Sequence, residues 1–265
     1  MPLETLTLTY TQPHRAVATV TLNRPDVRNA FNETMIAELA ATFLELASDD
    51  GVRVIVLAAT GKAFCAGADL NWMKKMAGYS DVENRADAMA LATMLRTIHT
   101  CPKPVVARVH GDCYAGGTGL VAACDIAIAA QEAAFCLSET RLGLIPATIS
   151  PYVIAAMGQR AASRYFLTAE RFDAAEAHRI GFVHDVVPTE ALDAAITTLS
   201  ATLVANSPNA MKETKRLIRD VAHRVIDDAL VADTAERIAM IRTSDEGRNG
   251  IRSFLEKRKP KWIGG

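Results

Sequence analysis

Short, fully apolar segments that alternate with helical patterns constrain the fold of this chain most. The segment Val54–Ala58 reads Val-Ile-Val-Leu-Ala, as expected of a strand that is covered on both faces. Two β-rich segments and one helical pattern precede it. They are strands at 6–10 and 16–22, a turn between them at Pro13 and His14, and a helix over 33–47 with Asn32 as its N-cap. This order predicts an α/β fold with parallel strands and crossover connections.

The same order recurs in the middle of the chain. A helix is predicted over 82–98, a strand over 104–109, a short helix from near Gly117, and another strand over 125–129. Parallel strands bring their carboxyl ends to one edge of a sheet, where helix N-termini offer free N–H groups. We therefore expect the residues that follow the buried strands to form the ligand site.

Two segments of small residues follow these strands, Phe64–Leu70 and Ala115–Leu120, and an acid, Glu139, comes later. Small side chains let main-chain N–H groups approach a ligand, and two such groups on one oxygen stabilise a developing oxyanion. The combination predicts an enzyme that stabilises an enolate and moves a proton with one glutamate. The alternative interpretation is that the small residues serve only tight turns and close packing.

Charge and hydropathy patterning narrow the partners of the chain. Its formal net charge of -1 gives no long-range attraction to nucleic acid or to an anionic membrane, so neither partner is expected. No apolar run is long enough to span a bilayer, and no basic segment precedes an apolar core at the N-terminus. We expect a cytoplasmic protein.

Cysteines and histidines show no metal or redox pattern. The five cysteines lack C-x-x-C spacing and are predicted to be small core residues, with a reactive thiol at Cys65 or Cys113 as the alternative. Histidines and carboxylates lack ligand spacing, and Gly111 to Gly119 lack dinucleotide spacing, so no metal, nicotinamide or flavin cofactor is expected. His110 is expected to be a hydrogen-bonded structural residue.

The last third of the chain is helical and more charged. Helices are predicted over 192–205, 210–221, 229–243 and 250–257. We place a boundary near residue 195, which divides the chain into a core at 1–195 and a helical C-terminal region at 196–265.

Several motifs, in the same order along the whole chain, resemble the crotonase (enoyl-CoA hydratase/isomerase) superfamily. These are Asn23-Arg24-Pro25 through Arg28-Asn29-Ala30, Ala66-Gly67-Ala68-Asp69, Ala115-Gly116-Gly117, Cys124-Asp125 and Phe254 to Lys259. The resemblance implies a spiral of ββα units with a C-terminal helical region that forms trimers or dimers of trimers. It also implies that the N–H groups of Ala68 and Gly116 bind the thioester carbonyl.

The resemblance also implies a coenzyme A site, in which coenzyme A is part of the substrate and not a separate cofactor. Arg28 would lie near the pantetheine and phosphates, and the backbone around Ala66 and Asp69 near the adenine. Ala30 and Leu70 are further residues expected to bind coenzyme A or the substrate. Lys62 would be a phosphate neighbour. Phe254 and Lys257 would reach the nucleotide bound to an adjoining subunit, since phosphates need cationic partners.

The catalytic carboxylates depart from this family's pattern. Related hydratases carry a first glutamate three residues after the oxyanion glycine, where this chain has Gly119, and a second one that matches Glu139. One carboxylate suffices to move a proton between two carbons, which favours a double-bond isomerase. Hydration stays open, because water could be held near Ala147, by the hydroxyl of Thr118 or Tyr114, or by a carboxylate of the substrate.

Longer strings favour hydration of a branched substrate. Ala68 to Met73, Phe135 to Ala147 and Ile149 to Ile154 resemble the bacterial methylglutaconyl-CoA and isohexenylglutaconyl-CoA hydratases. The implied reaction converts 3-methylglutaconyl-CoA to 3-hydroxy-3-methylglutaryl-CoA in leucine or isovalerate catabolism. The acyl pocket would involve Trp72, Tyr114, Gly119 and Ala147, and the candidates for binding a distal carboxylate are Arg141, Arg160 and Tyr152. A non-catalytic acyl-CoA-binding or RNA-binding protein is the alternative of another class.

Overall fold

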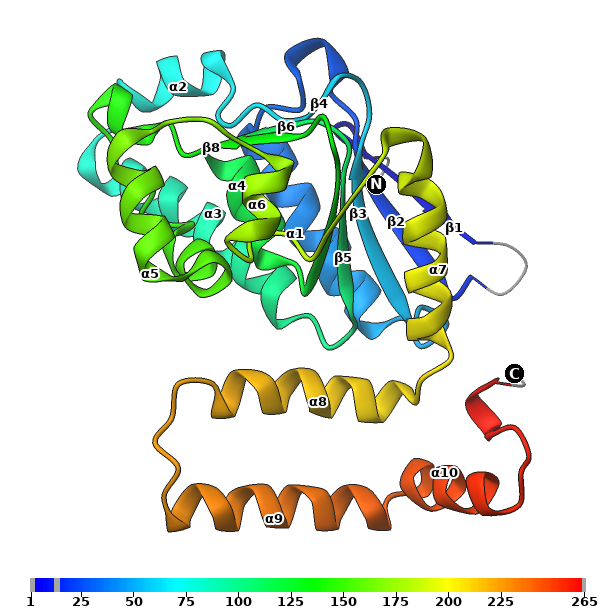
Figure 1. The fold of residues 1–265 in the computed structure, drawn as a ribbon. Helices are drawn as coiled ribbons and strands as arrows, with labels where there is room; N and C mark the ends of the chain where they lie inside the picture. The colour runs from blue at the N-terminus through cyan, green and yellow to red at the C-terminus, as the bar shows by residue number, and fades with distance from the viewer. Residues whose placement is uncertain (1–2, 12–14, 264–265) are drawn as a thin grey trace.

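The computed structural model describes residues 3–11 and 15–263, so the turn predicted at Pro13 and His14 lies outside the described residues. Within them, ten strands form two sheets (Figure 1). The large sheet has the order β1 (Leu6–Tyr10), β2 (Val17–Leu22), β3 (Val54–Ala59), β5 (Val105–Val109), β7 (Ile126–Ala130) and β10 (Asp185–Val187). The small sheet has the order β4 (Ala63–Cys65), β6 (Asp112–Tyr114), β8 (Ala134–Cys136) and β9 (Phe172–Asp173).

The chain winds between the two sheets in a repeated ββα pattern. Strands β3, β5 and β7 pair in parallel in the large sheet, and each continues after a short turn into β4, β6 or β8, which pair in parallel in the small sheet. The helices are α1 (Glu33–Ser48), α2 (Leu70–Met76), α3 (Asp81–Thr100), α4 (Gly116–Ala123), α5 (Ser150–Thr168), α6 (Ala174–Arg179), α7 (Leu192–Val204), α8 (Pro208–Val221), α9 (Asp228–Thr243) and α10 (Asp245–Leu255). Four short 3₁₀ segments are η1 (Pro25–Val27), η2 (Glu139–Leu142), η3 (Thr189–Ala191) and η4 (Lys261–Ile263). The predicted α/β spiral of ββα units is confirmed.

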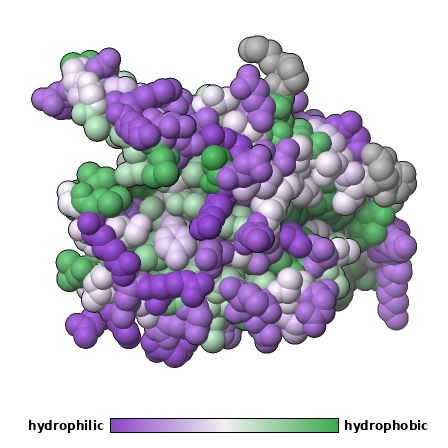
Figure 2. All heavy atoms as spheres, turned by 90° about the horizontal axis from the view of Figure 1, so that it is seen from above, coloured by the Kyte–Doolittle hydropathy of each residue, from purple (hydrophilic) through white to green (hydrophobic). Residues whose placement is uncertain are grey.

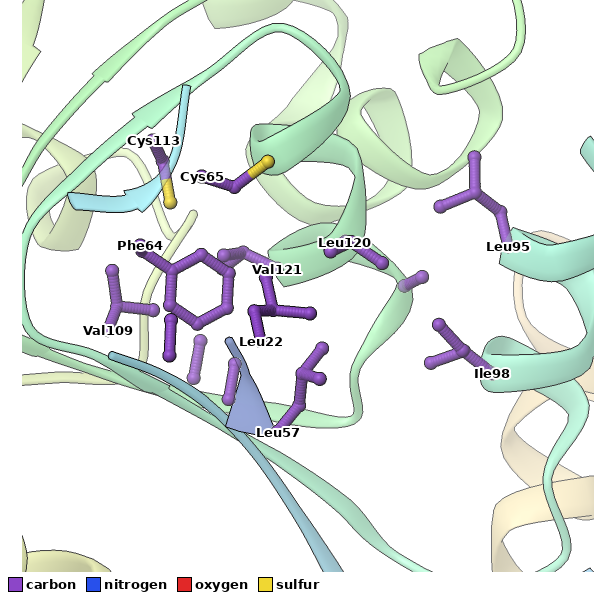
Figure 3. Packing of buried hydrophobic residues seen from close by; sticks show 14 of the residues in the cluster. Leu22, Leu57, Phe64, Cys65, Leu95, Ile98, Val109, Cys113, Leu120 and Val121 are labelled. Carbon is purple, nitrogen blue, oxygen red and sulfur yellow. The ribbon is translucent and has the colours of Figure 1, made fainter. Parts of the chain in front are cut away.

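The main core lies between the two sheets and the helices that follow them. Figure 3 shows Phe64 of the small sheet packed against Val109 and Val121, with Leu22 and Leu57 of the large sheet close by. These side chains are almost completely buried. Because burial of apolar area drives folding, this layer holds the small sheet, and the residues that follow its strands, in a fixed position.

Helix α7 covers the opposite face of the large sheet. Its residues Leu192 and Ile196 pack with Val54, Val56 and Val106 in a second apolar cluster. The boundary predicted near residue 195 therefore lies inside a helix that packs on the core.

Helices α8, α9 and α10 extend from the body as an arm (Figure 1). Arg53 at the start of β3 donates hydrogen bonds to the carbonyls of Val204 and Asn206 at 3.3 and 2.5 Å, where α7 ends. Trp262 Nε1 donates to the Ala205 carbonyl at 3.1 Å. These contacts fasten the connection between the body and the arm.

Most predicted elements agree with the structure to within a few residues, with two differences. Helix α10 begins at Asp245 and not at Gly250, because the Ser244 hydroxyl caps it by accepting a hydrogen bond from the Gly247 N–H. The small-residue segments follow β4 and β6, three-residue strands of the small sheet, and not the long strands of the large sheet. In the part of the chain that the structure describes, no helix is long and apolar enough to cross a membrane.

Candidate active site

Three segments of the chain meet at one edge of the small sheet. Strands β4, β6 and β8 are neighbours, run in parallel, and end at Cys65, Tyr114 and Cys136. The Ala115 N–H donates to the Cys136 carbonyl at 2.8 Å, which ties the second small-residue segment to the chain leading to Glu139. Segments 66–69, 115–119 and 137–139 therefore begin side by side, as the sequence predicts for parallel strand ends.

The first small-residue segment is held by Phe31. The Phe31 N–H donates to the Gly67 carbonyl at 2.7 Å, and the Asp69 N–H donates to the Phe31 carbonyl at 2.8 Å. Ala68 lies between these two bonds, and its own N–H has no acceptor among the described residues. This arrangement leaves one main-chain donor available to a ligand.

The second segment begins helix α4. The first N–H groups of a helix have no partner within it. In α4 the Gly119 N–H is the first to donate along the helix, to the Ala115 carbonyl at 3.2 Å, and the Gly116 N–H has no acceptor in the described chain. Ala115 has φ 47° and ψ −116°, a region that residues with a Cβ rarely adopt. Backbone strain of this kind is concentrated at functional sites, where packing over-determines the conformation.

Close packing explains why residues 116 and 117 are glycines. A Cβ on Gly116 would lie 2.8 Å from the Phe31 ring, and one on Gly117 would lie 2.7 Å from the Cβ and carbonyl oxygen of Cys65. Phe31 thus pairs with Ala68 on one side and touches Gly116 on the other. The two free donors thus lie on either side of Phe31. Close packing and oxyanion binding are therefore not exclusive alternatives, because the same small residues can serve both.

Glu139 begins η2, immediately beyond the end of β8. Its carboxyl is half-buried, and its Oε2 is buried without a hydrogen-bond partner in the described residues. Burial raises the pKa of Glu139, because the charged form loses hydration, and a hydrogen bond from its own backbone only partly offsets this effect. Leu137 is buried beside it, whereas Leu142, also expected to bury the acid, is exposed.

The position of the missing second glutamate is filled by another side chain. A Cβ on Gly119 would lie 2.2 Å from Cγ2 and 2.7 Å from Cβ of Ile149, which is 2% exposed. Apolar packing therefore leaves no room for a side chain at residue 119.

Two of the groups proposed to hold water are already engaged. The Thr118 hydroxyl is completely buried and donates to the Cys113 carbonyl at 3.4 Å. The Ala147 N–H donates to the Ile145 carbonyl at 2.8 Å, and the Ala147 carbonyl accepts from Ser150. These bonds make the two groups less available to a water molecule, and the partly exposed Tyr114 stays a candidate as well.

A loop before α1 braces the site from the side. Asn29, completely buried at φ 55°, donates from Nδ2 to the carbonyls of Thr60 and Ala63 and accepts from the Arg24 N–H. Asn is one of the few residues that tolerate this left-handed conformation. The Arg24 guanidinium donates to the Ala30 carbonyl at 2.6 Å and to Asp69 Oδ2 at 2.9 Å. These bonds join the loop to the first small-residue segment.

Asp69 has a structural role in this bracing. Its Oδ1 accepts hydrogen bonds from the Asn71 and Trp72 N–H groups and so caps α2. Burial by itself would raise the pKa of Asp69, but the bonds from Asn71 and Arg24 outweigh it and lower the pKa. Asp69 is ionised and fully engaged, which leaves Glu139 as the available carboxyl at these strand ends.

The residues expected to bind coenzyme A divide into two groups. Arg28, Ala30, Lys62, Ala66 and Leu70 lie together around the braced loop: the Arg28 carbonyl accepts from the Ala66 N–H at 3.0 Å, while Lys62 and Leu70 are exposed. Phe254 lies in α10 and Lys257 just after it, on the arm (Figure 1).

Several large apolar side chains are exposed on α2, on α3 and along the chain from η2 onward. They are Leu70, Val82, Met89, Leu142, Leu144 and Ile145, of which Leu142 ends η2. Figure 2 shows hydrophobic side chains gathered at the left, on the side that carries α2 and α5 in Figure 1. Trp72 is core-packed, and its Nε1 donates to Asp87 at 3.0 Å, which links α2 to α3.

The three candidates for a distal carboxylate lie in different places. Arg141 is in η2, two residues after Glu139, and its side chain is exposed. Arg160 is exposed on α5. The Tyr152 ring lies edge-on to the His99 ring, with 5.2 Å between the ring centroids. Tyr152 also lines a cavity of about 1030 Å³ between α8 and the body, and Glu139 is not among the residues that line this cavity. Arg141 is therefore the candidate closest in sequence to the acid.

The alternative chemistries find no support at this site. Cys65 and Cys113 are completely buried, and burial raises the pKa of Cys65 to about 12 and that of Cys113 as well, so both stay protonated thiols. His110 Nε2 lies 2.9 Å from the Gly61 carbonyl, which confirms that the residue is hydrogen-bonded, while its Nδ1 is buried without a partner in the described residues. Among the described residues no group of His, Cys, Asp and Glu is placed to hold a metal ion.

Sequence reasoning missed Arg24, Asn29, Phe31 and Ile149 as parts of the site. Asn29 carried a usable signal, since Asn is favoured where the backbone turns left-handed. Ile149 carried none, because nothing in an apolar residue indicates which distant glycine it will cover.

Comparison with known proteins places these features in one family. The family model described as enoyl-CoA hydratase/isomerase matches residues 12–265. A short-chain-enoyl-CoA hydratase of Clostridium acetobutylicum is 32% identical over 92% of each chain. Mevalonyl-coenzyme A hydratase sidH of Aspergillus fumigatus is 29% identical over 96% of this chain and 93% of its own. The crystal structure of an enoyl-CoA hydratase from Shewanella pealeana matches with a TM-score of 0.94 and 45% identity, over 98% of this chain and 96% of the other.

Proposed function

This chain belongs to the enoyl-CoA hydratase/isomerase family and is a hydro-lyase, and we propose that its substrate is 3-methylglutaconyl-CoA or a related branched glutaconyl-CoA. With 3-methylglutaconyl-CoA, the product is 3-hydroxy-3-methylglutaryl-CoA, an intermediate of leucine or isovalerate breakdown. The observation that supports the reaction type is that the ends of three neighbouring strands carry two unpaired N–H groups, at Ala68 and Gly116 in the described chain, and the carboxyl of Glu139, whose Oε2 is buried without a partner.

The proposed chemistry uses these groups in order. The N–H groups of Ala68 and Gly116 hold the thioester oxygen, and the N-terminus of α4 adds a favourable dipole. Water adds its oxygen to the β-carbon while the double-bond electrons move to form the enolate, and the proton that water loses passes to Glu139. Glu139 then returns a proton to the α-carbon, so the enzyme ends in its starting state.

Two observations support a branched substrate. One relative is named as a mevalonyl-coenzyme A hydratase, and mevalonyl thioesters carry a methyl group on the β-carbon. The exposed guanidinium of Arg141, close in sequence to Glu139, offers a cation for the distal carboxylate of a glutaconyl group.

Double-bond isomerisation is the second candidate, and a specific observation favours it. Residue 119 is glycine, and Ile149 covers it, so the site offers one carboxylate, which is enough to carry a proton from one carbon to another. A non-catalytic acyl-CoA-binding or RNA-binding protein is less well supported, because a buried carboxyl without a partner reduces stability and serves no purpose in a pure binder.

The arm is proposed to complete the nucleotide site of an adjoining subunit in a trimer or a dimer of trimers. Phe254 is 82% exposed, and Lys257 follows it at φ 54°, so both are available to a neighbour. Sedimentation analysis of the purified protein tests the assembly, and a monomer that turns over acyl-CoA would contradict it.

Incubation of the purified protein with three thioesters tests the reaction. These are 3-methylglutaconyl-CoA, crotonyl-CoA and a 3-enoyl-CoA, with products separated by chromatography. We expect 3-hydroxy-3-methylglutaryl-CoA to form fastest. Preferential conversion of the 3-enoyl-CoA to the 2-enoyl-CoA would favour the isomerase, and binding without turnover would favour the third class.

A further inference from the structure

We infer that Ile149 is a specificity-determining residue, which keeps a second carboxylate and its water away from residue 119 and so leaves the whole proton transfer to Glu139. The inference rests on the proposed function, because it concerns how the same site divides its turnover between hydration and double-bond migration. Nothing in the local sequence around Gly119 indicates this role; it emerges from the packing of a residue thirty positions later.

The inference depends on the space beside Gly119, which the side chain of Ile149 occupies. Gly119 lies in the first turns of α4, three residues after the Gly116 donor. Any Cβ there would meet Cγ2 of Ile149 at 2.2 Å and its Cβ at 2.7 Å, distances that real contacts do not reach. Ile149 is 2% exposed, so its branched side chain is fixed in the core at the start of α5.

An apolar side chain at this place changes where water can be activated. A water molecule needs two or more polar partners, and the packed contact between Ile149 and Gly119 offers neither space nor such partners. The acid available at the strand ends is Glu139, because Asp69 is engaged with Arg24 and with the N-terminus of α2. Water must therefore be deprotonated by the carboxylate that later protonates the α-carbon.

This arrangement makes the competing reaction accessible. Removal of a proton from C2 of a 3-enoyl-CoA gives a conjugated dienolate, whose charged thioester oxygen the same two N–H groups would hold. Return of that proton to C4 gives the 2-enoyl-CoA, with no other reactant. A site with one carboxylate and an apolar wall can perform either reaction. The Ile149 wall thus sets the ratio of hydration to isomerisation.

Three variants test the inference. Gly119→Glu alone should fold poorly or lose activity, because of the contact with Ile149. The double variant Gly119→Glu with Ile149→Gly removes both atoms within 3 Å and leaves the Ile149 Cα at 3.7 Å. We expect it to raise the ratio of crotonyl-CoA hydration to 3-hexenoyl-CoA isomerisation at least about tenfold, since a positioned general base typically contributes a factor of roughly 10² or more.

Ile149→Val is the matched control. Valine keeps Cβ and Cγ2, the atoms that cover Gly119, and loses only the terminal methyl group, so the ratio should stay within about twofold of wild type. A purely structural role for Ile149 would change both rates together and leave their ratio unchanged.

The outcomes separate the inference from the proposed function. A wild type that converts neither substrate contradicts the proposed function itself. An active wild type, together with a folded double variant whose ratio is unchanged, contradicts the role of Ile149 alone.

If the double variant does not fold, a thermal-unfolding cycle with Gly119→Ala and Ile149→Gly provides the test. Gly119→Ala should lower Tm strongly in the wild-type background and clearly less in the Ile149→Gly background, where both atoms within 3 Å are gone. Equal losses in both backgrounds would overturn the inference.

Discussion

Replacement of Glu139 by glutamine should lower kcat and, above the pKa of Glu139, raise the free energy of unfolding. Glutamine keeps the size of the side chain and removes the ionisable carboxyl. Asp69 cannot replace it, because its two oxygens already bind Arg24 and the first N–H groups of α2. A positioned general acid–base contributes roughly 10²–10⁴-fold. We therefore expect kcat to fall about 10³-fold, or about 4 kcal/mol of barrier.

Binding of the thioester should be affected much less. The free N–H groups of Ala68 and Gly116 belong to the main chain and are positioned by Phe31 and Ala115, none of which contacts the changed group in the hydrogen-bond network of the described residues. Hence KM should change by no more than a few fold. Steady-state hydration kinetics on the preferred thioester measure both constants.

Stability should change with the opposite sign and depend on pH. Burial raises the pKa of Glu139 above its ordinary value of 4.5, so between 4.5 and the raised pKa the folded state binds more protons than the unfolded state. In that window the free energy of unfolding decreases as pH rises. The Gln variant lacks this loss, so it should be more stable than wild type at pH 8, with the difference disappearing near pH 4. Urea unfolding at fixed protein concentration measures this difference.

Two results would refute this reasoning. If the Gln variant retained more than about a tenth of wild-type kcat, Glu139 would not be the acid–base group. If it were less stable than wild type at every pH, the carboxyl would have a structural partner that the structure does not contain. Glu139→Asp is the control for geometry, because it keeps the charge and withdraws the carboxyl by one methylene.

Three further substitutions test the backbone of the site. Ala115→Gly should raise the free energy of unfolding by about 1 kcal/mol, because relief of a φ of 47° outweighs the added freedom of the unfolded chain; a loss of stability in urea unfolding would contradict the strain. Asn29→Ala should cost about 3 kcal/mol in the same assay and raise KM for the thioester, since buried carbonyls lose their donor, and an unchanged KM would exclude a bracing role. Gly117→Ala should lower Tm and kcat together, because its Cβ would lie 2.7 Å from Cys65; normal activity would mean that α4 can move.

The elements that sequence patterns predict well here are those whose residues make a local pattern. The apolar run at β3 and the capped helix α1 appear almost where the sequence places them. Strands β4, β6 and β8 span three residues each, too few to show any alternation, although they carry the site. These strands form only because they pair with one another in the small sheet, and no single segment of the sequence indicates that pairing.

The candidate site divides in the same way. Ala68, Gly116 and Glu139 could be identified because each follows a strand and because main-chain donors require small residues around them, which is visible in sequence. Asn29 and Arg24 act through contacts with residues about 30 to 45 positions away, such as Ala63 and Asp69, so their roles became visible only in the folded chain.

Main-chain groups and side chains therefore constrain the chemistry of this site differently. The oxyanion donors follow from strand ends and a helix start, so any chain with this topology and these small residues would place them similarly. Whether water is also activated depends on what fills the space beside Gly119, and Ile149 fills it from another ββα unit. Because Cγ2 and Cβ of Ile149 exclude a carboxylate there, paired substitutions at residues 119 and 149 should shift the reaction while the donors and Glu139 stay unchanged. The balance between hydration and isomerisation therefore depends on how side chains pack beside Gly119. The binding of the thioester carbonyl depends instead on main-chain N–H groups.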